Sequence, residues 1–211
     1  MIGAQLRAFT GEHDSHLNLF LRYARGLAAY GEFAVPDSLA LDRSASNAHE
    51  LTLSAGGNYE IGPVAVTLGA TFRSFRNANE RLDFEDLDEG IVLLRPHLFF
   101  VDWAGVALEG SYQVQQRGTL VAPLTDPTNT LNLEPLVGTL GRIGVIPFIT
   151  PSGPGAYRRP WIYLSYVASF RNDGARQLYP QDDVFRVRKI EHFVGLGAEW
   201  WFSSSSYGGG Q

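Results

Sequence analysis

Alternation of apolar and polar residues with a period of two recurs along this chain and constrains its fold more than any other feature. The clearest stretch is 105–117, in which apolar and polar residues take turns. The apolar set there is Val106, Leu108, Gly110, Tyr112 and Val114. Because successive side chains of a β-strand point to opposite faces, this alternation indicates a strand with one apolar and one polar face.

The same pattern predicts an all-β fold of nine strands, at residues 1–10, 16–31, 49–61, 63–75, 90–101, 104–117, 136–149, 160–171 and 189–202. Pro96, Pro147 and Pro160 fall within or at the start of three of them, where proline removes a backbone donor. The connections at 11–15, 62, 102–103 and 150–159 are short, and those at 32–48, 76–89, 118–135 and 172–188 are long and polar. Short turns at one end and long loops at the other are typical of outer-membrane barrels.

The sequence alone does not say which way the apolar faces point. In a soluble β-barrel or β-sandwich that binds a small ligand, which is the alternative hypothesis, they would form a dry core. Three features favour a transmembrane barrel with its apolar faces toward lipid. The strands are long, aromatic residues collect near strand ends (Tyr59, Phe72, Tyr112, Phe170, Trp200 and Phe202), and charges stand within strands. Arg22, Glu109 and Glu199 are such charges, which a water-filled lumen tolerates.

Composition excludes several classes of protein. The chain has 211 residues, no cysteine and a formal net charge of −5, which argues against cysteine-ligated metals and a nucleic-acid partner. It has no run of 18 apolar residues, so we expect no transmembrane helix. Residues 1–6 lack the features of a signal peptide, which an outer-membrane protein needs. Either the protein is cytosolic or the front of the gene is missing.

The order of several motifs resembles the C-terminal half of the maltoporin-type (LamB) carbohydrate porins. Residues 9–13 followed by 17–24 look like that family's tenth and eleventh strands, and 94–97 resemble its recurring Arg-Pro motif. Residues 157–164 resemble the start of its penultimate strand, and 193–202 its closing strand. The resemblance implies half of an 18-stranded antiparallel barrel that forms homotrimers in the outer membrane. Residues 1–202 would be the barrel fragment and 203–211 a flexible tail.

The resemblance also implies a path for maltooligosaccharides along aromatic residues of the lumen. Trp201 stands at the aromatic position of the last strand, and Tyr157 at the aromatic before Arg-Pro; the third aromatic is missing or replaced by Phe20. A girdle position for Trp201 and simple turn packing for Tyr157 remain alternatives. Strand parity places Glu199 beside Trp201 and turns a further set toward water, where each could bind sugar hydroxyls. That set is Arg22, Arg73, Arg95, His97, Glu109 and Arg142.

Other chemistry has weaker support. Residues 12–16 contain metal-ligand types in a tight turn, and the acidic residues between 80 and 89 could hold Ca²⁺, but a solvated loop is the better interpretation of both. Glu109 and Glu199 could form a carboxylate pair for glycoside hydrolysis, although nothing connects their strands. We expect a passive sugar porin with no catalytic residues, metal or cofactor, whose partners are oligosaccharides and outer-membrane lipid.

Overall fold

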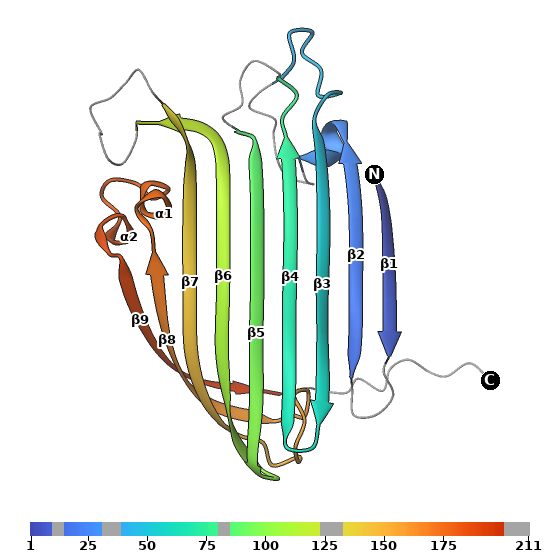
Figure 1. Ribbon diagram of the computed structural model, residues 1–211, viewed down its shortest axis with the longest axis vertical. Coiled ribbons are helices and arrows are strands. Elements are labelled where there is room, and N and C mark those ends of the chain that lie inside the picture. The colour runs from blue at the N-terminus through green and yellow to red at the C-terminus, as the bar shows by residue number, and fades with distance from the viewer. Residues whose placement is uncertain (10–14, 31–38, 80–84, 123–132, 201–211) are drawn as a thin grey trace, which may run out of the picture.

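One open antiparallel sheet of nine strands makes up the fold in the computed structural model, which describes residues 1–9, 15–30, 39–79, 85–122 and 133–200 (Figure 1). The strands are β1 (Ile2–Phe9), β2 (His16–Arg25), β3 (His49–Ile61), β4 (Val64–Arg76), β5 (Leu87–Val101), β6 (Ala104–Val121), β7 (Glu134–Ile149), β8 (Trp161–Arg171) and β9 (Ile190–Glu199). Each pairs with its neighbours in the chain, so the order is β1 to β9 without a crossover. The all-β prediction and the nine predicted strands are confirmed.

Two strand ends differ from the prediction by four residues or more. The strand expected at 16–31 stops at Arg25, because Gly26 adopts a positive φ of 68° and the short 3-10 helix η1 (Gly26–Ala29) follows. Strand β6 runs on to Val121 past an irregularity between Arg117 and Leu120. Tyr112 therefore lies in the middle of β6, and the prediction that it lies near a strand end is wrong.

Two prolines occupy strand interiors and interrupt the pairing on one side only. The pairing of β5 with β6 skips Arg95 and Pro96, although Pro96 still lies opposite Val66 of β4. The pairing of β7 with β8 likewise skips Ile146 and Pro147. Because proline has no N–H to donate, the ladder opens on the side where that donor would have pointed.

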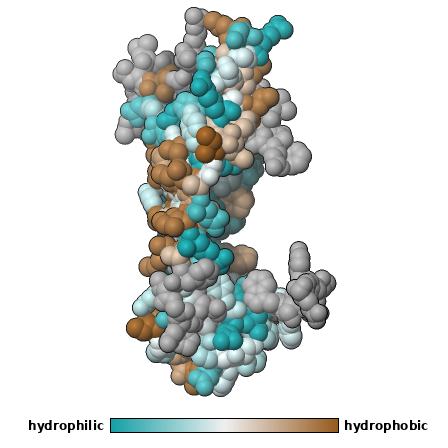
Figure 2. Space-filling view, turned by 90° about the vertical axis from the view of Figure 1, so that its right-hand side faces the viewer, coloured by the Kyte–Doolittle hydropathy of each residue, from teal (hydrophilic) through white to brown (hydrophobic). Residues whose placement is uncertain are grey.

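The register divides the side chains between two faces of different character. The face that we call the apolar face carries Leu53, Leu108 and Leu196, of which Leu108 is 50% and Leu196 81% exposed. Figure 2 looks onto the β1 edge and shows hydrophobic residues gathered in a column along one side of the middle of the molecule. Within the described ranges no second sheet or helix covers this face, so it does not form a dry core.

The other face, here called the charged face, is covered by described residues only at its two ends. At the short-turn end Phe99, Phe148 and Trp161 form an apolar cluster, with the rings of Phe148 and Trp161 stacked 4.3 Å apart. The β7–β8 connection closes this end, because the backbone N–H of Ala156 donates to Glu60 Oε1 of β3 over 2.8 Å. The sheet thus curls so that segments 96 residues apart touch.

At the long-loop end, η1 packs over the charged face of β2–β4, and the short helices α1 (Asp173–Gln177) and α2 (Val184–Val187) lie beside the ends of β7–β9 (Figure 1). Helix α1 contacts β7 and β8. Among the described residues, no helix has the length and hydrophobicity needed to span a bilayer. Within the described ranges, the folded connections leave the middle of the charged face open between two covered ends.

Candidate functional site

The charged face is the candidate site, because the register brings together on it every in-strand residue that the sequence named and the structure describes. These residues are Phe20, Arg22, Arg73, Arg95, His97, Glu109, Arg142 and Glu199. Side chains directly opposite one another in antiparallel strands share a face, so parity along each strand was enough to group them. Trp201 lies outside the described residues.

A hollow of about 700 Å³ on this face is built around a carboxylate that holds two arginines. Arg22 Nη2 donates to Glu50 Oε1, and Arg73 Nε donates to Glu50 Oε2 over 2.6 Å. Phe20 and Tyr30 also line the hollow. The arrangement, which we call the Glu50 site, offers two guanidinium groups with further N–H donors beside aromatic rings.

Glu50 itself is almost fully buried, with 2% of its side chain exposed. The ring of Tyr30 meets Phe75 edge-on at 5.1 Å, and the N–H of Ala78 donates to Tyr30 Oη over 3.0 Å. The period-two pattern of residues 49–61 puts Glu50 on the polar face of its strand, but the sequence analysis did not name it as a site residue. Thr52 lies opposite Arg22 of β2 and Arg73 of β4, and Glu50 is two residues away on the same face. A carboxylate this close to two arginines was the signal that could have found Glu50.

A second ion pair lies nearer the short turns. Arg95 donates from Nε to Glu109 Oε2 over 2.9 Å, across the gap that Pro96 leaves in the β5–β6 ladder. Arg142, exposed on β7, has no ion-pair partner among the described residues. It stands between Ser111 of β6 and Ser169 of β8, both short side chains. The middle of the charged face therefore combines one paired and one unpaired guanidinium group.

The expectation that His97 faces water is wrong. His97 does lie on the charged face, but it is only 3% exposed because the sheet curls over it at the short-turn end. Its ring meets Trp161 edge-on at 5.4 Å and Phe148 at 6.2 Å. His97 thus belongs to the apolar cluster, where the described structure gives it no open surface for a ligand.

Glu199 and Tyr157 lie at the same short-turn end. Glu199 Oε2 accepts a hydrogen bond of 2.7 Å from Arg159 Nε, and the Arg159 guanidinium lies 4.7 Å from the ring centroid of Trp161. Tyr157 lies in the β7–β8 connection, with its ring 5.7 Å from that of His16 on β2. Glu109 and Glu199 each have their own arginine partner, so neither is a free carboxylate.

The connection between β8 and β9 carries a further cluster of charges. Asp173 accepts a hydrogen bond from Arg176, and this bond, followed by the charge of Lys189 3.7 Å away, holds the pKa of Asp173 below its usual value of 3.8. In the acidic segment, Asp88 pairs with Arg76 over 2.7 Å, and Asp86 Oδ1 accepts from the N–H of Asn77. The described residues contain no group of three side chains arranged to hold a metal ion.

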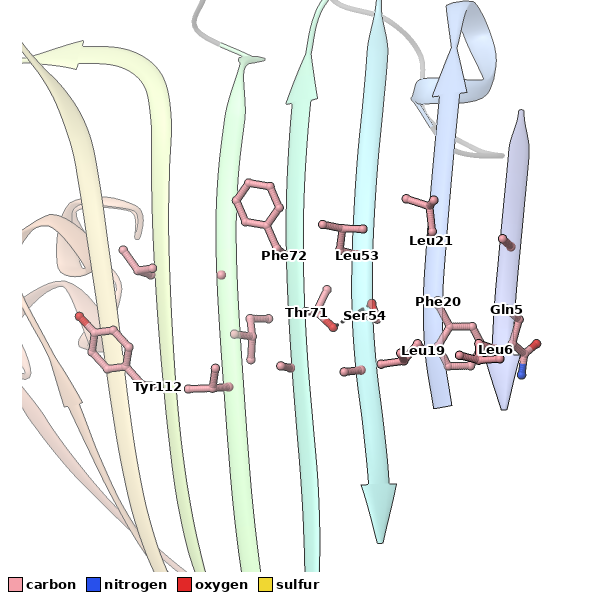
Figure 3. A pocket seen from close by; sticks show the side chains of 17 residues that line it. Gln5, Leu6, Leu19, Phe20, Leu21, Leu53, Ser54, Thr71, Phe72 and Tyr112 are labelled. Carbon is pink, nitrogen blue, oxygen red and sulfur yellow. Dashed lines mark hydrogen bonds between the residues drawn. The ribbon is translucent and has the colours of Figure 1, made fainter. Parts of the chain in front are cut away.

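Another hollow, of about 730 Å³, lies on the opposite, apolar face (Figure 3). Small residues such as Ala55, Ala70 and Gly90 leave room between the larger side chains of Leu53 and Phe72. Such a lining suits a hydrocarbon chain better than a polar ligand.

Comparison of the sequence with protein-family models and with curated proteins finds no match.

Proposed function

We propose that this chain forms part of the wall of a passive outer-membrane channel for neutral oligosaccharides, with the apolar face toward lipid and the charged face toward water. The proposal includes no catalytic step. It is the function that the maltoporin resemblance implies, in which full-length chains form trimers.

The observation that carries the proposal is the exposure of the apolar face over all nine strands. Leu53, Leu108 and Leu196 are exposed together with aromatic residues such as Tyr59 and Trp200. Soluble monomers rarely expose contiguous apolar patches larger than a few hundred Å², whereas lipid would stabilise such a face at about 25 cal/mol per Å². A bilayer is therefore the environment that matches this surface.

The charged face supports the choice of sugar as the permeating solute. Flat rings such as Phe20 pack against the apolar C–H faces of a pyranose. Arginines held by Glu50 and Glu109 can donate charge-assisted hydrogen bonds to hydroxyl oxygens. Several moderate sites in series would let a sugar leave each one in turn.

Strand direction indicates how the open sheet would close into a channel. Nine antiparallel strands leave β1 and β9 running in the same direction, so the sheet could close on itself only through a parallel pair. An odd number of further strands would restore antiparallel pairing at both edges. In the proposal the nine strands are one half of an 18-stranded barrel, the number that the maltoporin resemblance implies.

The test is to add the purified chain to phospholipid vesicles and measure flotation with the vesicles and the uptake of maltotriose. We expect flotation that resists alkaline carbonate and, because two copies of the chain would supply the 18 strands of a closed barrel, osmotic swelling in maltotriose that is faster than in empty vesicles. Arg22→Gln combined with Arg73→Gln should slow maltotriose entry without changing flotation. A chain that stays soluble in buffer without detergent and does not float would overturn the proposal in favour of a soluble ligand-binding protein.

A further inference from the structure

The connection between β7 and β8, residues 150–160, crosses the charged face at the short-turn end, and we call it the strap. It reaches as far as β3, where the N–H of Ala156 donates to Glu60 Oε1 over 2.8 Å. The ring of Tyr157 lies 5.7 Å from that of His16 on β2. In Figure 1 the strap lies at the lower end of the sheet, near the turn between β3 and β4. A segment from one side of the sheet thus contacts strands near its other side.

Hydrogen bonds to the backbone hold the strap in one shape. The N–H of Thr150, a fully buried residue, donates to the carbonyl oxygen of Trp103 over 2.7 Å. The N–H of Arg158 donates to the carbonyl oxygen of Gly155 over 3.2 Å, and Gly155 has a φ of 133°, which favours glycine. The strap is therefore a folded element that keeps its place over the charged face.

Two carboxylates of the sheet anchor the strap from strands that are far apart in the sheet order. Glu60 of β3 is itself positioned, because its Oε1 also accepts from Asn58 Nδ2 over 3.0 Å. On the other side, Glu199 of β9 accepts from Arg159 Nε over 2.7 Å, and the side chain of Arg159 is 11% exposed. Arg159 Nη1 also donates to the carbonyl oxygen of Ala156 over 2.9 Å. The strap is thus tied to β3 and β9 at once.

The strap also packs on the apolar cluster of this end. Ala156 is 6% exposed and belongs to the same cluster as Phe99, Phe148 and Trp161. A solute that moves along the charged face toward the short turns would therefore meet the strap and the cluster together. Toward the middle of the face, by contrast, Arg142 is exposed.

We propose that the strap is the narrowest point of the water path and sets the largest sugar that can pass, with Glu60 as the residue that positions it. The inference rests on the proposed function, because only a water-filled charged face gives the strap a solute to exclude. Removing the acceptor at Glu60 should free the N–H of Ala156 and let the strap lift from β3.

The first experiment compares Glu60→Leu with Glu60→Gln in the detergent-solubilised chain. Leucine removes the acceptor of the Ala156 N–H, whereas glutamine keeps a carbonyl oxygen in its place. Trypsin can cut the strap after Arg158, which is exposed, and mass spectrometry identifies that cut. We expect this cleavage to be about tenfold faster in Glu60→Leu than in the unaltered chain, the effect of one lost hydrogen bond. Glu60→Gln should restore the slow cleavage.

The second experiment measures osmotic swelling of vesicles in glucose and in maltohexaose, two sugars of the same chemistry and different size. Glu60→Leu should raise the ratio of maltohexaose entry to glucose entry several-fold, because a lifted strap leaves a wider path. A general weakening of the sheet would change the entry of both sugars alike. Gly155→Ala should raise the ratio too, since it strains the strap without changing the sheet, and it serves if Glu60→Leu fails to fold.

Glu89→Leu is the matched control. Glu89 lies on the charged face near the long loops, where its Oε1 accepts from Gln113 Nε2 over 2.6 Å, and the strap does not reach it. This variant should leave the cleavage after Arg158 and the ratio of the two sugars unchanged.

Unchanged cleavage or an unchanged sugar ratio in Glu60→Leu would overturn the inference, and so would the same changes in Glu89→Leu. If glucose enters the vesicles and the ratio stays constant in every variant, only the strap inference fails. If neither sugar enters with the unaltered chain or with any variant, the channel proposal fails and the size limit fails with it.

Discussion

Replacing Glu50 by glutamine should destabilise the sheet more than the equivalent change at Glu109. The buried carboxylate of Glu50 accepts from two arginines, whereas Glu109 accepts from Arg95 alone. Hydrogen bonds to charged groups contribute about 1.5–3 kcal/mol each when fully shielded. The Arg22 and Arg73 side chains are 48% and 38% exposed, so solvent screening reduces this to about 1 kcal/mol per arginine.

We therefore expect Glu50→Gln to lower the free energy of unfolding by about 2 kcal/mol and Glu109→Gln by about 1 kcal/mol. Urea titration in detergent micelles, followed through the fluorescence of the buried Trp161, measures both values. In about 1 M NaCl, where the Debye length falls to about 3 Å, the two losses should shrink. Equal losses in the two variants, or a Glu50→Gln loss that salt leaves unchanged, would refute the reasoning that the second arginine contributes separately.

Three further changes test the faces, the packing and the outer connection. Leu108→Arg on the apolar face should make folding into vesicles less favourable by about 2–4 kcal/mol, while Ser111→Arg on the charged face of the same strand should change the folding free energy little. Gly105→Ala should destabilise the fold, because a Cβ there would lie 2.4 Å from the carbonyl oxygen of Leu98, whereas Gly110→Ala meets nothing within 4 Å and should be silent in the same urea titration. Because the pKa of Asp173 is lowered in the folded chain, its stabilising effect is present above the usual carboxyl pKa and lost only as pH falls through the lowered value. Proteolysis of the 172–189 connection should accordingly stay constant from pH 7 to about pH 5 and rise below about pH 4, and Asp173→Asn should remove that rise.

The sequence by itself determined the strands and the composition of their two faces. Alternation is a local property, so Leu53, Leu108 and Leu196 could be assigned to one side and Arg73, Glu109 and Arg142 to the other without knowledge of any distant contact. The positions and lengths of the short and long connections followed from the same assignment of strands. The sequence determined the strand ends less well. Strand β2 stops at Arg25 because Gly26 adopts a positive φ, and the alternation of residues does not reveal that conformation.

Only the tertiary structure decided which members of the charged face are open to a ligand. His97 and Arg142 both belong to the charged face by their positions along the strands. The curl of the sheet nevertheless buries His97 and leaves Arg142 exposed. Glu50 is 1% exposed and the side chain of Arg171 is 7% exposed, although both belong to the charged face. These outcomes depend on contacts between segments far apart in the chain, such as Glu60 with Ala156, and the period-two pattern of a strand holds no information about what will lie above it.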